Sequence, residues 1–134
     1  MIAYGKGLYA SGATAIASGK EGATWVKMPN EAYFTGVQFP ASMVSESAKL
    51  QASFSSDGSN SFCPVDPVAV AMDGQDNSPQ NIISVASGST ISGLYVEIGH
   101  RIRSLHKKSG DLYLNVETSA TETAKNVTFH FRIV

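Results

Sequence analysis

The segment Lys49–Val65 constrains the fold most, because it carries the sequence pattern of a β-hairpin. Its first part alternates apolar and polar side chains, and this pattern predicts a strand with Leu50 and Phe54 on its buried face. The polar segment Ser56–Asn60 contains Asp, Gly and Asn, which tolerate the backbone conformations of a tight turn. Phe62 follows the turn and returns beside Phe54 if the hairpin forms. The sequence therefore predicts paired antiparallel strands here.

Short strand patterns recur along the rest of the chain, and no stretch has a sustained helical period. The clearest is Asn126–Val134, in which Val127, Phe129, Phe131 and Ile133 are expected to face inward and Thr128, His130 and Arg132 outward. Further strands are predicted in Ala13–Ser18, Ala23–Met28, Glu31–Phe39, Asn81–Val85, Ile91–Leu105 and Leu112–Val116, with Thr118–Lys125 as a polar loop. The two prolines of Pro64–Met72 make it an edge strand or a connection.

Eight to ten short strands with evenly spaced turns predict an all-β fold, an antiparallel, jelly-roll-like β-sandwich. The length of 134 residues fits one domain, residues 1–134. Within it Met1–Ser11 is expected to be a mobile arm, either simple terminal disorder or a segment that drapes over a neighbouring subunit. Glu31–Phe39 is apolar on both faces, as in a strand that is central in a sandwich or lies against a partner.

Composition and charge exclude several classes of function. The chain is 43% hydrophobic and 16% charged, which is typical of a folded protein, and its net charge is −1. That charge argues against bulk binding to nucleic acid or to an anionic membrane. Cys63 is the only cysteine, so no internal disulfide is possible. No signal-peptide core or membrane-spanning run is evident, and we expect synthesis and retention in the cytoplasm unless the chain leaves within an assembly.

The sequence carries no recognisable catalytic constellation. Three aspartates, Asp66, Asp73 and Asp76, offer oxygen ligands but lack the spacing of a known calcium loop. The histidines and the single cysteine do not have zinc-site spacing. Glu117 and Glu122 flank the predicted polar loop and are expected to be solvated. The sequence therefore predicts a protein that is not an enzyme and that uses no cofactor or metal.

Two groups of residues are candidates for binding. The one basic cluster comprises His100, Arg101, Arg103, Lys107 and Lys108. It is either a solvated strand face followed by a charged turn, or a contact for an acidic protein partner. Exposed aromatic rings form sugar-stacking platforms in other proteins, and the candidates by type are Trp25, Tyr33, Tyr95 and Tyr113. The alternative for these four is a place in the core or in a subunit contact.

An ordered set of short motifs resembles a known protein family. The motifs are Ala17-Ser18-Gly19, Val26–Pro29, Phe34–Pro40, Leu50–Gly58, Phe62 and Val65, Arg101–Ser104, and the closing Val127–Val134 with Arg132 near its end. In order and spacing they resemble the head-decoration, or capsid-cement, proteins of tailed bacteriophages. The resemblance implies a jelly-roll-like sandwich that sits on a capsid, and it brings no catalytic residues.

This resemblance and the absence of recognisable catalytic motifs lead to one expected function. We expect a non-enzymatic virion structural protein, made in the host cytoplasm, that binds and stabilises the capsid. Its expected partners are the major capsid protein and further copies of itself, with no nucleic acid and no membrane. The alternative is a carbohydrate- or receptor-binding module of a phage tail or fibre, in which case the partner is a glycan or receptor.

Overall fold

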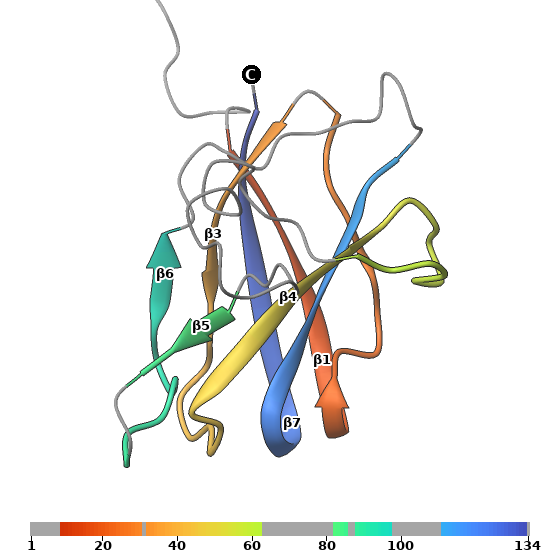
Figure 1. Ribbon diagram of the computed structural model, residues 1–134. Helices are drawn as coiled ribbons and strands as arrows, with labels where there is room; N and C mark the ends of the chain where they lie inside the picture. Colours follow the sequence, from red (N-terminus) through yellow and green to blue (C-terminus); the bar gives the residue numbers. More distant parts are fainter. Residues whose placement is uncertain (1–8, 31, 63–81, 86–87, 98–110, 134) are drawn as a thin grey trace, which may run out of the picture.

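The computed structural model describes residues 9–30, 32–62, 82–85, 88–97 and 111–133 (Figure 1). Every helix or strand element within these ranges is a strand, and every strand pair is antiparallel. The strands are β1 (Tyr9–Glu21), β2 (Val26–Lys27), β3 (Ala32–Gln38), β4 (Ser47–Ser53), β5 (Ile82–Ser84), β6 (Tyr95–Glu97) and β7 (Tyr113–Ile133). The predicted antiparallel all-β fold is confirmed, whereas its jelly-roll-like sandwich form stays a prediction.

Strand β7 organises the whole sheet. Its first part, residues 113–118, pairs with β2 and β4, and β4 in turn pairs with β5. Its last part, residues 128–133, pairs with β3, which in turn pairs with β6. Strand β1 runs along residues 117–132 of β7, with an irregularity between Gly19 and Glu21. Figure 1 shows β7 turning back on itself, so that its two parts carry two groups of neighbours.

The two parts of β7 contribute to a single hydrophobic core. Phe34 packs against Phe129 and Phe131, with ring centroids 5.7 and 5.9 Å apart. Val116 in the first part of β7 and Leu50 on the neighbouring strand β4 are buried in the same cluster. The predicted inward face of the last strand is confirmed, since Val127, Phe129 and Phe131 are buried and Ile133 packs against them.

A bulge in β3 explains why its sequence is apolar on both faces. Pairing with β7 shifts by one residue between Phe34 and Gly36. Such an extra residue reverses the alternation of side chains beyond it. As a result Phe34 and Val37 both reach the core, although they lie an odd number of positions apart. The strand needs no subunit partner to bury them.

Two sequence-based boundaries were wrong. Residues 118–125, predicted as a polar loop, continue strand β7, because β1 pairs with this segment and hydrogen bonds satisfy its buried polar groups. The predicted arm, Met1–Ser11, overlaps β1, in which Tyr9 pairs with Arg132 and Ser11 with His130. The first eight residues lie outside the described ranges.

Candidate binding surfaces

Strand β4 continues into the predicted hairpin. Ala52 and Phe62 exchange both backbone hydrogen bonds, each 2.8 Å long, and this pairing confirms the predicted return of the chain. The turn residues Gly58 and Asn60 adopt positive φ angles of 80° and 53°. Figure 1 shows the hairpin extending to one side of the sheet, as the yellow-to-green loop beyond β4.

Phe54 was predicted to lie on the buried face of the strand, and this prediction was wrong. It is 43% exposed and Phe62 is 38% exposed, and their rings contact each other with centroids 5.1 Å apart. The alternation of β4 breaks at Ser53, which is fully buried because its hydroxyl donates to the carbonyl of Ser59 and accepts from the amide of Ser55. With Ser53 turned inward, the next side chain points out. We call Phe54, Phe62 and the turn between them the hairpin surface.

Asp57 holds the turn of the hairpin surface together. Its Oδ1 atom accepts hydrogen bonds from the hydroxyls of Ser55 and Ser59, both at 2.6 Å, and from the amide of Ser59 at 2.9 Å. These hydrogen bonds, first those from Ser55 and then those from Ser59, lower the pKa of Asp57 from 3.8 to about 2. Trp25 packs on the backbone of Gly58, where a larger residue would clash with the indole. The two phenylalanines are thus presented on an ordered loop.

A second candidate surface lies on the outer side of β1, β7, β3 and β6. It is a hollow of about 410 Å³ whose side chains include Tyr9, Thr35, Tyr95, Glu97, His130 and Arg132, and we call it the tyrosine hollow. Strand pairing brings these residues together, because Tyr9 lies opposite Arg132, and Glu97 lies opposite Gly36, next to Thr35. The rings of Tyr95 and His130 pack edge to face, and His130 Nε2 lies 3.0 Å from Gln38 Oε1. The hollow combines aromatic, cationic and anionic side chains.

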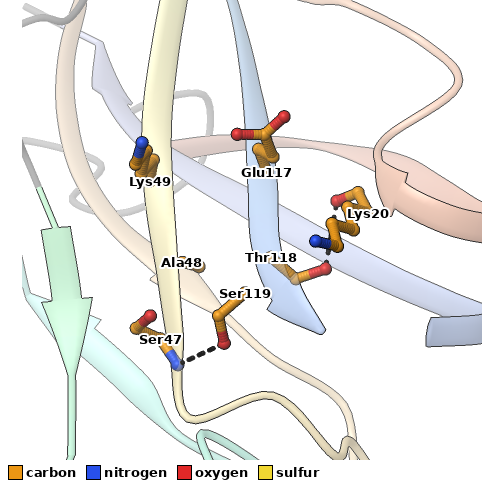
Figure 2. Close-up of a pocket in the computed structure, with 7 residues that line it drawn as sticks. All are labelled: Lys20, Ser47, Ala48, Lys49, Glu117, Thr118 and Ser119. Carbon is orange, nitrogen blue, oxygen red and sulfur yellow. Dashed lines mark hydrogen bonds between the residues drawn. The ribbon is translucent and has the colours of Figure 1, made fainter. Parts of the chain in front are cut away.

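A third candidate surface is a hollow of about 260 Å³ where β4 meets β7 and the end of β1, which we call the junction hollow (Figure 2). Glu117 on β7 is flanked by Lys49 on β4 and by Lys20 on β1. The hydroxyl of Thr118 donates to the carbonyl of Lys20, and the amide of Ser47 donates to the hydroxyl of Ser119. These hydroxyls are engaged in joining the strands. Because the charges are mixed and the hydroxyls already bond to neighbouring strands, we interpret this hollow as a junction between strands and not as a ligand-binding site.

The four aromatic residues predicted as sugar-stacking platforms differ in their exposure to solvent. Tyr95 is 54% exposed, whereas Trp25, Tyr33 and Tyr113 are half-buried. Of the four, Tyr95 alone lines the tyrosine hollow. Its neighbours His130 and Arg132 were predicted only as outward residues of the last strand, since their approach to β6 depends on strand order that the sequence does not reveal.

The other predicted sites have different outcomes. The basic cluster, His100, Arg101, Arg103, Lys107 and Lys108, lies outside the described residues, as do Cys63, Asp66, Asp73 and Asp76. Within the described ranges, no three His, Cys, Asp or Glu side chains are grouped to hold a metal ion. Glu122 was expected in solvent, but it is buried, because backbone amides and a hydroxyl surround its carboxylate.

The chain was compared with known protein families and with curated protein sequences. No model of a known protein family matches it, and no curated protein sequence matches it either. Over the described ranges, the structure has no helix long and apolar enough to cross a membrane.

Proposed function

We propose that this protein is a non-enzymatic structural protein of a tailed phage, which docks on the outside of the capsid and stabilises the contacts between its subunits. The sequence resemblance supplies the class of partner. The main structural support is the hairpin surface, where the large apolar side chains of Phe54 and Phe62 are exposed and can contact a partner. Aromatic side chains of this kind are frequent anchors of protein interfaces.

The order of the hairpin supports its role as the docking element. A loop that is already fixed loses little conformational freedom when it binds, so more of its contact energy appears as affinity. Asp57 fixes the turn, and Gly58 packs against Trp25. The exposed rings of Phe54 and Phe62 already contact each other, so they present one continuous apolar surface to a partner.

The test uses shells assembled from the major capsid protein of the same phage, without this protein. Wild-type protein should co-sediment with the shells and saturate at a fixed ratio. The double variant Phe54→Ser with Phe62→Ser should lose at least about tenfold in affinity, because it removes two anchors of the contact. A matched control, Tyr9→Ser with Tyr95→Ser, also removes two exposed rings, but on the tyrosine hollow, and should bind shells normally. Absence of saturable binding by the wild type would refute the proposal.

A second function is favoured by a different observation. A carbohydrate- or receptor-binding module needs an accessible aromatic platform bordered by polar groups. The tyrosine hollow has this arrangement, with the exposed Tyr95 beside Glu97, His130 and Arg132. The hollow and the hairpin surface lie on different parts of the sheet, and the two functions are therefore separable by mutation.

A further inference from the structure

The position of Tyr95 depends on a glycine. A Cβ atom at Gly36 would lie 2.5 Å from the phenol oxygen of Tyr95 and 2.6 Å from its Cζ. At such distances any other residue would displace the Tyr95 side chain, so the end of the ring lies directly on the β3 backbone. His130 contacts the ring at 5.5 Å between centroids with an interplanar angle of 60°, and Gln38 positions His130 in turn. The ring is held from two sides and still remains more than half exposed.

The surroundings of this ring are polar and balanced in charge. Glu97 carries one negative charge and Arg132 carries one positive charge, and both side chains are exposed at the hollow. A carboxylate accepts hydrogen bonds and a guanidinium donates several, so the pair satisfies hydroxyl groups, which both donate and accept. Because the two charges offset each other, the hollow has no net attraction for a strongly anionic ligand such as a phosphate ester.

A second aromatic residue extends the hollow across the sheet. Tyr9 on β1 is 64% exposed and lies opposite Arg132. Strands β1 and β6 are separated by β7 and β3, which corresponds to three strand spacings, or about 14 Å across the sheet. Tyr9 is level with Arg132 and Tyr95 is level with Thr128, so the two backbones are also about 14 Å apart along β7 and about 20 Å apart in all. The hollow of about 410 Å³ between these rings falls in the range of small-ligand sites. Its two ends therefore suit a ligand longer than one ring.

We infer that the tyrosine hollow binds a neutral oligosaccharide, with one pyranose ring stacked on Tyr95 and the sugar hydroxyls bound by Glu97 and Arg132. A pyranose has an apolar face of C–H groups, which complements an aromatic ring, and a rim of hydroxyls, which needs the polar neighbours. The inference deepens the second function proposed above and does not depend on capsid docking, since it uses none of the residues of the hairpin surface.

The test begins with a glycan array that contains neutral and acidic oligosaccharides, probed with the full chain. The tightest neutral glycan is then titrated by calorimetry against the wild type and three variants. Tyr95→Ala should weaken binding about tenfold or more, because it removes the stacking face. Tyr95→Phe keeps that face and should stay within about threefold of the wild type. The matched control Phe54→Ala removes an exposed ring from the hairpin surface and should bind the glycan normally.

Melting temperatures separate loss of binding from loss of folding. Tyr95→Ala with an unchanged melting temperature and weakened glycan binding supports the inference. If that variant unfolds, Glu97→Gln and Arg132→Gln, which alter exposed side chains, must each weaken binding instead. The inference is overturned by an array without neutral hits, by hits confined to acidic glycans, or by neutral binding that survives all of these changes. Shell binding that fails while glycan binding persists removes only the capsid proposal.

Discussion

The carboxylate of Glu122 accepts hydrogen bonds from both the amide and the hydroxyl of Ser45, although the two residues are 77 positions apart. The same carboxylate accepts from the amide of Val44 at 3.0 Å. Glu122 is 2% exposed and Ser45 is fully buried. This contact attaches the loop before β4 to the turning point of β7, and it links the two groups of strands that β7 carries.

Loss of the Glu122 carboxylate should destabilise the fold. Glu122→Ala leaves buried donors unsatisfied and should lower the free energy of unfolding by about 2–4 kcal/mol. Glu122→Gln keeps the shape and one acceptor oxygen, and should cost about 1–2 kcal/mol. Urea unfolding followed by circular dichroism measures both values. Glu117→Gln, on the same strand but half-buried, serves as the control and should change stability by less than about 0.5 kcal/mol.

Phe129 in the core and Phe54 on the hairpin surface should respond differently to truncation. Phe129→Ala empties a fully buried site and should cost about 3–5 kcal/mol. Phe54→Ala removes a ring that is partly in solvent and should cost less than about 1.5 kcal/mol, mainly through its contact with Phe62. Thermal unfolding measures both changes. Equal losses for the two variants would show that Phe54 is packed in the core.

The hairpin turn should lose stability in acid. The pKa of Asp57 is about 2 in the folded chain, below its ordinary value of 3.8, so its ionised form stabilises the turn above pH 3.8. This contribution declines as the pH falls below 3.8 and is lost below about pH 2. Trp25 is the only tryptophan and packs on Gly58, so its fluorescence reports the turn. The emission should change between pH 4 and pH 2, and Asp57→Asn should abolish that component of the change.

The basic cluster remains a sequence-based hypothesis about the capsid contact. If Arg101 and Arg103 face an acidic capsid surface, changing both to Glu should weaken shell binding more at low salt than at high salt, because salt screens exposed charges. Binding isotherms at two salt concentrations measure this difference. Lys20→Glu with Lys49→Glu makes the same change in net charge at the junction hollow and is the control. Equal weakening by both pairs would indicate a general effect of charge rather than a docking site.

Local patterns predicted the hairpin and the last strand, because turn residues and alternation are properties of neighbouring residues. The outward turn of Phe54 was missed, since it depends on the hydrogen bonds that draw Ser53 inward. The continuity of β7 was missed because Thr118 and Glu122 are polar, and their burial is satisfied only by distant partners. The tyrosine hollow could be predicted only in part, since the sequence marks Tyr95 as aromatic but not its contact with His130.

The melting of capsid shells tests the capsid proposal most directly. Shells that lack this protein are mixed with saturating wild-type protein, and their disassembly temperature is followed by light scattering. A ligand that binds only the assembled shell stabilises it by mass action, so the disassembly temperature should rise with the concentration of the protein. The Phe54→Ser, Phe62→Ser variant should need a much higher concentration for the same rise. An unchanged disassembly temperature at full wild-type saturation would contradict a stabilising role on the capsid.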